Sequence, residues 1–366
     1  MKLFYFYGNL KVMKYIFLLL ITGFAFCSCG KKVTFKENGF SKVEIVHIIE
    51  DSLLDVRAME IVKNDAVFFL TSAGFGGVVY YTEVDDMTNF VYPIPMAHDS
   101  IKNNFRAFAS TSKNGFALSI GSPARLYKIK NDEKIIVYTE THPKAFYDSM
   151  DFWNDEEGIA IGDATDGCLS IIITRDAGET WVKIPCSNLP KSTKNEGAFA
   201  ASDTNIAIVG DNTWVATTAG RVYFSADKGK TWQVFDTPMV KKQDTEGIYS
   251  IDFYDALHGF AIGGDYTKPD AKAANKIRTK NGGKTWELVA ENKNPGYRSC
   301  VQYIPNRAGK ELVALGFKGI DYSNDSGNSW KHISNESFYT IRFLNDSVAY
   351  AAGAGRVSKL IFKQEI

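Results

Sequence analysis

Apolar and polar positions alternate along most of the chain in short runs, and the same pattern returns at intervals. Each unit begins with a short apolar strand, passes through a polar turn and ends in a second apolar strand, which Gly or Gly-Asp often follows. Seven such units begin near Arg57, Arg106, Ser149, Gly197, Ser250, Arg298 and Tyr339. Alternation bounded by turn residues is typical of half-buried strands, so the pattern predicts an all-β protein.

Four segments of eight residues align without gaps and share the form S/T-x-D/N-x-G-x-T/S-W. Each lies between two strand-like runs, which makes it a hairpin turn. The Asp or Asn side chain can bond backbone N–H groups, Gly can adopt a positive φ and Trp can cover the apolar face. These structural roles fall to Asp176, Gly178, Trp181, Asp227, Gly229, Trp232, Asn281, Gly283, Trp286, Asp325, Gly327 and Trp330. The Gly-Asp pairs that end at Asp163, Asp211 and Asp265 are assigned first to turns as well.

Each unit is followed by a third strand, and six units have a fourth strand before the next unit begins. Four antiparallel strands per unit and seven units predict a seven-bladed β-propeller. A six-bladed ring is the alternative, because the first two units lack the repeated hairpin. The last unit ends after its third strand, 356–362, and we expect 42–49 to supply its outer strand and close the ring.

The N-terminus has the pattern of a secretory signal. Lys11 and Lys14 precede an apolar run over 15–26, which ends in Cys27-Ser28-Cys29-Gly30. An apolar core of about 12 residues is shorter than the roughly 20 that span a bilayer, so cleavage is favoured over a transmembrane helix. The stretch resembles a bacterial lipoprotein signal, which implies cleavage before Cys29 and lipidation of that residue. Ordinary signal cleavage is the alternative.

These features divide the chain into a signal peptide over 1–29 and a single propeller domain over 30–366. They predict export to a bacterial envelope, at the periplasmic or outer-membrane surface, with a lipid anchor as the only membrane contact.

The four hairpins resemble the Asp box, or bacterial neuraminidase repeat, of sialidases and related propellers. The stretches at 150–153, 158–163 and 196–202 are similar to secreted Bacteroidetes propellers of the photosystem II assembly-factor type, many of which are labelled oxidoreductases. The resemblance implies a propeller over the mature chain and, through the assembly factor, a protein partner. It carries little information on chemistry, because one fold hosts many functions.

Charge and motifs narrow the choice of partners. Lys plus Arg equals Asp plus Glu at 42 each, so no global basic field favours nucleic acid. The five His residues lack metal-ligand spacing, no Gly-x-Gly-x-x-Gly lies between a strand and a helix, and no haem motif occurs. We therefore predict no metal and no cofactor, and the oxidoreductase reading has no motif to support it.

Candidate functional residues come from the starts of the inner strands, which gather around the mouth of a propeller. Arg57, Arg106 and Arg298 could together hold a carboxylate or a phosphate by charge-assisted hydrogen bonds. Each could instead pair with a nearby Asp or Glu.

Three carboxylates, Asp148, Glu196 and Glu246, lie in the matching region of other units. Two carboxylates about 5 to 9.5 Å apart would suit glycoside hydrolysis. Trp214 lies in a less repetitive segment, where it could stack on a sugar or pack between blades.

The body of the chain has three cysteines after cleavage at Cys29. Cys168 and Cys186 come almost opposite each other across one hairpin, which is within disulfide reach in an oxidising compartment. Cys300 lies in an inner-strand pattern and is expected to be a buried small apolar residue.

The sequence therefore predicts a monomeric, noncatalytic envelope lipoprotein whose mouth binds a protein or glycan partner, as an assembly or recognition module. The alternative is a glycan-active hydrolase or lyase of sialidase-like architecture, with Asp148, Glu196 or Glu246 acting beside the three arginines. A sialidase-type Arg-Ile-Pro is absent from the sequence. An oxidoreductase is the third reading.

Overall fold

The computed structural model describes residues 39–62, 66–82, 87–96, 102–131 and 133–364. The predicted signal peptide and Cys29 lie outside these ranges. Among the described residues, regular structure consists of β-strands and one short 3-10 helix, η3 (Cys186–Asn188). None of the helices in these ranges is long and apolar enough to cross a membrane. The all-β expectation is confirmed.

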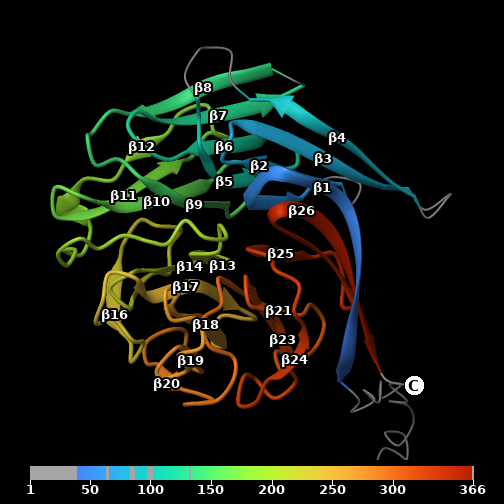
Figure 1. Ribbon diagram of the computed structural model, residues 1–366. Coiled ribbons are helices and arrows are strands. Elements are labelled where there is room, and N and C mark those ends of the chain that lie inside the picture. The colour runs from blue at the N-terminus through green and yellow to red at the C-terminus, as the bar shows by residue number, and fades with distance from the viewer. Residues whose placement is uncertain (1–38, 63–65, 83–86, 97–101, 132, 365–366) are drawn as a thin grey trace, which may run out of the picture. The chain divides into compact units, whose positions relative to one another are not determined.

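Five sheets have four antiparallel strands each, hydrogen-bonded in chain order (Figure 1). The first comprises β5 (Phe105–Ser110), β6 (Gly115–Ser119), β7 (Ala124–Lys130) and β8 (Glu133–Glu140). The second comprises β9 (Tyr147–Phe152), β10 (Gly158–Thr165), β11 (Cys168–Thr174) and β12 (Val182–Lys183). The third comprises β13 (Ile206–Val209), β14 (Asn212–Ala216), β15 (Arg221–Ser225) and β16 (Gln233–Asp236). The fourth comprises β17 (Glu246–Phe253), β18 (Gly259–Asp265), β19 (Lys276–Thr279) and β20 (Glu287–Leu288). The fifth comprises β21 (Cys300–Tyr303), β22 (Leu312–Gly316), β23 (Gly319–Ser323) and β24 (Lys331–Ser334).

A sixth sheet joins the two ends of the described chain, in the order β25-β26-β1-β2-β3-β4. It comprises β25 (Thr340–Phe343), β26 (Val348–Gln364), β1 (Phe40–Ile61), β2 (Val67–Thr71), β3 (Phe75–Thr82) and β4 (Met87–Pro95). The first part of β1 pairs with β26, and its last part pairs with β2. The amide of Phe362 donates to the carbonyl of Ser347 at 2.8 Å, so β26 folds back on itself near Gly355, whose φ is 77°.

The structure is a β-propeller of antiparallel blades, and its six sheets match the six-bladed alternative. The prediction of seven separate blades is wrong, because the strands form six hydrogen-bonded sheets. The physical reason is the length of β1, which serves the last repeated unit and then continues as the inner strand of the first, so two units share one sheet. Around the axis, β1, β5, β9, β13, β17, β21 and β25 each contact the next strand, and β25 contacts β1.

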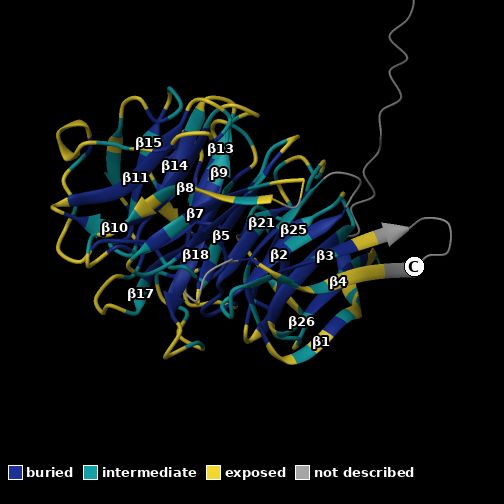
Figure 2. Cartoon of the chain, turned by 90° about the horizontal axis from the view of Figure 1, so that it is seen from above, coloured by how far each residue is buried: buried dark blue, intermediate teal, exposed yellow. Residues whose placement is uncertain are grey.

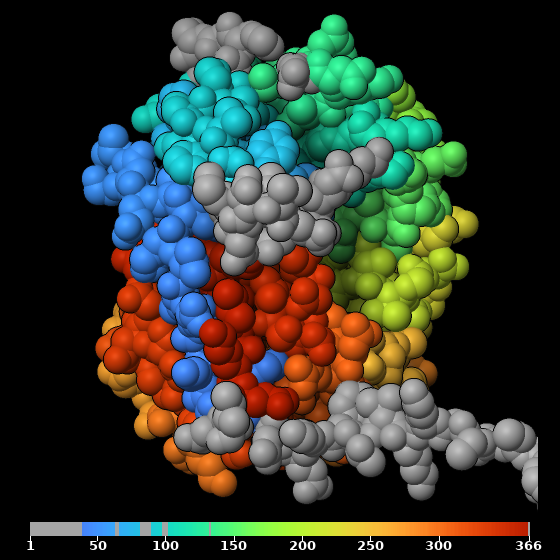
Figure 3. All heavy atoms as spheres, turned by 90° about the vertical axis from the view of Figure 1, so that its right-hand side faces the viewer, coloured from blue at the N-terminus to red at the C-terminus, as the bar shows by residue number. Residues whose placement is uncertain are grey.

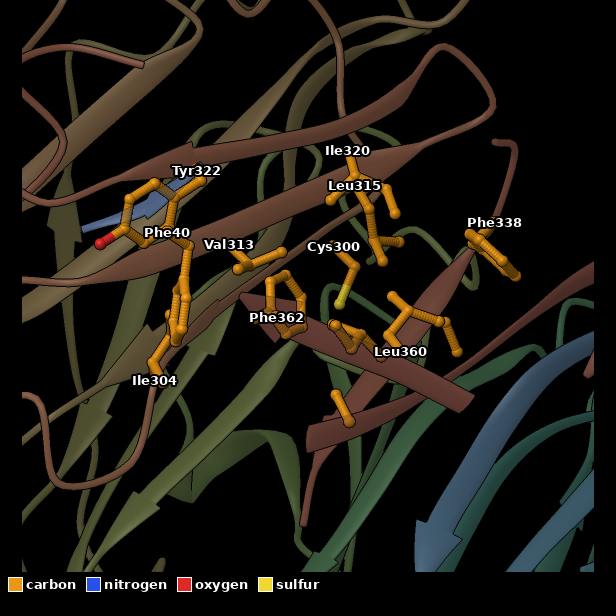
Figure 4. Close-up of a cluster of buried hydrophobic side chains, with 13 residues drawn as sticks. Phe40, Cys300, Ile304, Val313, Leu315, Ile320, Tyr322, Phe338, Leu360 and Phe362 are labelled. Carbon is orange, nitrogen blue, oxygen red and sulfur yellow. The ribbon is translucent and has the colours of Figure 1, made fainter. Parts of the chain in front are cut away.

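The two ends of the domain meet along β1 and β26. Residues 40–50 pair with 356–364, and the two segments run side by side on one face of the molecule (Figure 3). Phe40 is 4% exposed and packs with Phe362, Leu360 and the side chains of β21 to β23 around Cys300 (Figure 4). Where the ring closes, the N-terminal strand thus forms backbone hydrogen bonds and also buries apolar surface.

The four repeated hairpins hold their own turns and also contact the preceding sheet. In the hairpin at Ser323, the Asp325 carboxylate accepts from the amide and hydroxyl of Ser329 at 2.9 and 2.6 Å. Gly327 has a φ of 82°, and a Cβ there would lie 2.2 Å from the ring of Phe260 on β18. A Cβ on Gly178 would likewise lie 2.2 Å from the ring of Phe116 on β6. The turn glycines therefore permit close packing between neighbouring blades.

One predicted strand is absent. The fourth unit was expected to begin its inner strand at Gly197, but the structure has no strand over 197–202, and the inner strand of that sheet is β13. The residues before β13 instead enter the centre of the ring. Most strand residues in the interior are buried, whereas exposed residues lie in the loops and on strands such as β4 and β8 (Figure 2).

Candidate functional site

The axis of the propeller is filled by a segment of its own chain, residues 197–205, which we call the axial segment. The Asp203 carboxylate accepts from the amides of Phe108 on β5 and Met150 on β9, at 2.8 and 3.2 Å. The Ser202 hydroxyl donates to the carbonyl of Ser299, just before β21, at 2.7 Å. The Ser202 carbonyl accepts from the Thr340 hydroxyl on β25 at 2.8 Å. Residues on or next to the inner strands of four sheets therefore hold the segment.

Arg342 on β25 also forms a hydrogen bond with the axial segment. Its guanidinium donates to the carbonyl of Asp203 at 3.1 Å and to the Glu60 carboxylate at 2.6 Å. Burial raises the pKa of Asp203 well above its usual range, although Arg342 and the Phe108 amide act in the opposite direction. The buried Asp203 carboxyl group thus links the axial segment to two inner strands, and burial disfavours its ionised form.

Two of the three predicted arginines lie together at the face where the inner strands begin, which we call the mouth face. Arg57 donates to the carbonyl of Ala201 at 3.5 Å, and Arg106 donates to that of Ala200 at 3.4 Å. The Arg57 guanidinium also lies 4.1 Å from the centre of the Tyr339 ring. Burial and the neighbouring charge of Arg57 lower the pKa of Arg106, so the two cations are electrostatically coupled.

Asp148 belongs to the same neighbourhood, but it is fully buried. Neither carboxylate oxygen has a hydrogen-bond partner among the described residues. Burial, and then the charge of Asp163, raises the pKa of Asp148 well above its usual range. Asp163 accepts from the amide of Ala198 at 3.2 Å, and burial raises its pKa to about 6. A Cβ on Gly197 would lie 1.6 Å from the Asp163 carboxylate, so a glycine is needed where the axial segment passes.

Glu196 and Glu246 lie apart from this group, at a pocket of about 500 Å³ on the mouth face. Glu196 forms an ion pair with Arg221, and it accepts from the Thr217 hydroxyl at 2.8 Å. Glu246 accepts from the amides of Lys242 and Gln243 and so holds a turn. Both carboxylates have partners within the chain, and the structure does not bring them to Asp148.

The remaining two candidates are engaged in packing and ion pairing. Arg298 forms an ion pair with Asp321 at 2.5 Å and donates to the carbonyl of Tyr297 at 2.7 Å. Trp214 is fully buried; its ring stacks on Phe253 with centroids 3.6 Å apart, and its N–H donates to the carbonyl of Gly282 at 2.9 Å. Both faces of the indole therefore lie within the protein, between two sheets.

A group of aromatic side chains on the mouth face was not among the sequence candidates. Phe199 of the axial segment stacks on Tyr249 with ring centroids 3.7 Å apart, and Tyr249 meets Tyr297 edge to face at 4.7 Å. Tyr266 and Phe317 contact Tyr297 and are 49% and 38% exposed. We call these five residues the aromatic ridge. An aromatic residue near the start of three successive units, at 249, 297 and 339, is a sequence signal that could have pointed to this group.

The opposite end of the axis has a smaller pocket, of about 220 Å³, lined by the inner strands. Its acidic and basic side chains are Glu60, Asp151, Asp203, Asp252 and Arg342. Burial and the charge of Glu60 raise the pKa of Asp151 to about 7, and burial raises that of Asp252 to about 6. The axial segment separates this pocket from the mouth face.

Cys168 and Cys186 are joined by a disulfide bond, and Cys300 is a buried free thiol. Within the described ranges, no group of three or more His, Cys, Asp or Glu side chains is arranged to hold a metal ion.

No family model matches the sequence, and no curated protein matches it. Solved structures do share the fold. YCF48 bound to a D1 peptide is 11% identical, with 89% of this chain and 98% of that chain covered and a TM-score of 0.60. YCF48 from Cyanidioschyzon merolae is 11% identical, with 88% and 98% covered and a TM-score of 0.59. The RRP9 WD40 repeats are 11% identical, with 89% and 99% covered and a TM-score of 0.61. At this identity the likeness shows the fold alone, a β-propeller.

Proposed function

We propose that this protein is a noncatalytic binding module whose mouth face recognises a protein partner. The observation that carries the proposal is the axial segment, which fills the centre of the ring and places the aromatic ridge, Arg57 and Arg106 above it. Aromatic residues and arginines most often dominate the energy of protein interfaces, and Tyr266 and Phe317 are the exposed members of the ridge. YCF48, 98% of whose chain is covered by the likeness, has been solved bound to a D1 peptide.

The hydrolase alternative receives less support from the geometry. Glu196 is tied to Arg221, and Asp148 is fully buried. A carboxylate that acts on a glycosidic bond must reach the substrate oxygen or the attacking water. A protein-binding role requires no such access for either carboxylate.

The binding test uses peptides selected against the full chain from a displayed library. We expect the substitutions Tyr266→Ala and Phe317→Ala together to weaken peptide binding about tenfold or more, as for hot-spot residues. The matched control is Leu257→Ala, an exposed apolar residue at the other end of β18 from Tyr266. Equal binding by the two variants would contradict the proposal. Saturable glycan binding that only the ridge variant loses would replace the protein partner with a glycan.

We also infer that the hairpins are Asp boxes and that the protein is a lipoprotein of a bacterial envelope. The hydrogen bonds of Asp325 and the corresponding side chains support the first inference. The second rests on the sequence of 11–30. Mass spectrometry of the mature protein tests it: we expect a diacylglyceryl group on Cys29 that Cys29→Ser abolishes. A mature N-terminus at any other residue would contradict it.

A further inference from the structure

A second pocket on the mouth face, of about 290 Å³, lies between the fourth and fifth sheets. The loop after β18 contributes Pro269, Asp270 and Lys272, and the loop before β21 contributes 294–296. The other walls are Arg298, Lys318, Asp321 and His332. We call this space the blade pocket. No residue of the aromatic ridge lines this pocket, although Tyr297 and Phe317 are next to lining residues in the chain.

The floor of the blade pocket is a buried ion pair. Arg298 is 5% exposed and Asp321 is 1% exposed. The guanidinium contacts one Asp321 oxygen through Nε at 2.7 Å and Nη2 at 2.5 Å, and Nη1 donates to the Tyr297 carbonyl. These contacts use three of the five N–H groups of an arginine. The other Asp321 oxygen lies 3.1 Å from Nδ1 of His332, so one carboxylate contacts both a guanidinium and an imidazole.

Positive charge exceeds negative charge around this floor. Lys318 lies 3.6 Å from Asp270 at the rim, whereas Lys272 and Lys276 have no carboxylate within salt-bridge distance in the described part of the chain. Lys276 is 1% exposed, and its ammonium donates to three neutral oxygens, those of the Asn275 amide and the Lys293 and Pro295 carbonyls. Burial lowers the pKa of Lys276 to about 8, and the charge of Glu291 acts in the opposite direction.

We propose that the blade pocket binds a phosphate group. Two of the five N–H groups of Arg298 make no hydrogen bond to the described residues, and Lys272 and Lys318 can close on the anion from the rim. A doubly charged oxyanion accepts several charge-assisted hydrogen bonds and offsets the positive charge of the lining lysines and arginine. A neutral ligand would leave that charge without a counter-ion. The buried floor is fixed by Asp321, so little order has to be imposed when the anion binds.

The test titrates the full chain with inorganic phosphate at constant ionic strength, with binding followed by calorimetry and by the NMR signals of the His332 ring. We expect saturable binding, and we expect Lys272→Gln with Lys318→Gln to weaken it about fivefold or more. Lys241→Gln with Lys242→Gln, in the neighbouring pocket at Glu196, is the matched control of equal charge and should leave the affinity unchanged.

Three results would overturn the proposal: no saturable binding, an equal loss in both double variants, or acetate binding as tightly as phosphate. O-phosphoserine then identifies the source of the group. Tighter binding than inorganic phosphate assigns a phosphomonoester, and weaker binding assigns the free ion. A failure of this titration leaves peptide binding at the aromatic ridge untouched, so the two proposals are separable.

Discussion

Asp203 joins the axial segment to two inner strands through one carboxyl group. The amides of Phe108 and Met150 both lose their acceptor if that group is changed, and both are buried. We expect Asp203→Ala to lower the free energy of unfolding by about 1 to 3 kcal/mol per amide left unpaired. Asp211→Ala, at a side chain that is 69% exposed, should change it by less than about 0.5 kcal/mol. Urea denaturation of the two variants measures the difference, and similar values would contradict a junction at Asp203.

The pocket of about 220 Å³ at the end of the axis opposite the mouth face makes the free energy of unfolding depend on pH. The pKa of Asp151 is raised to about 7 by burial and by Glu60, whereas Phe152 and Arg342 act in the opposite direction. The folded state therefore holds this proton more tightly than the unfolded state. Its contribution to stability is complete below the unfolded pKa of 3.8 and is lost as the pH rises through 7.

We therefore expect the free energy of unfolding to fall between pH 5 and pH 8, and we expect Asp151→Asn to flatten this slope. Asp244→Asn, outside the pocket, should keep the slope of the parent. Urea denaturation across this range measures both, and a stability that rises with pH over the range would rule the account out.

At the residue scale, the sequence identified the arginines and Asp148 at the mouth but not what they contact. Arg57, Arg106 and Asp148 do come together, because inner strands begin at one face. Arg298 and Glu196 are held elsewhere by Asp321 and Arg221, and a charge partner that is distant in the chain cannot be read from the local pattern.

At the scale of the element, the repeated hairpin is a contact between blades as well as a turn. We expect Gly327→Ala to destabilise the protein by about 1 to 3 kcal/mol more than Gly167→Ala, because only the first places a Cβ against a neighbouring ring. Both glycines have a positive φ, 82° and 91°, so the backbone strain is matched. Thermal unfolding compares the pair, and equal midpoints would mean that the hairpin does not fix the spacing of the blades.

The hairpins could be placed from sequence because the hydrogen bonds that hold each turn are local. The axial segment could not, because residues 197–202 have the same apolar and small-residue pattern as an inner strand. Their hydrogen-bond partners include residues of inner strands on other sheets, up to 144 residues away along the chain. The extra length between Cys186 and β13 was the only local sign that this unit differs from the others.

For the whole molecule, the closure of the ring depends on the N-terminal strand. Phe40 is buried in the cluster that joins β1, β26 and the fifth sheet, whereas Val46 on the same strand is 44% exposed. We expect Phe40→Ala to lower the free energy of unfolding by about 3 to 5 kcal/mol and Val46→Ala to have a small effect. Chemical denaturation tests this pair, and an equal effect would contradict closure by packing at Phe40.

The architecture was predictable because four-stranded units repeat along the chain, but the number of sheets was not. Strand β1 continues through a bulge between Glu50 and Asp55 instead of breaking into two strands. Repeat counting therefore found the units, and the continuity of one backbone segment decided how many sheets they form.

The central claim is that a protein partner binds the mouth face above the axial segment. Site-specific photocrosslinking in the intact cell tests it directly, with the reactive residue placed at 266 or at 257. These positions lie beyond opposite ends of β18, and both native side chains are exposed. We predict that position 266 gives a discrete crosslinked protein that position 257 does not. Crosslinking to the same protein from 257 and not from 266 would contradict the account.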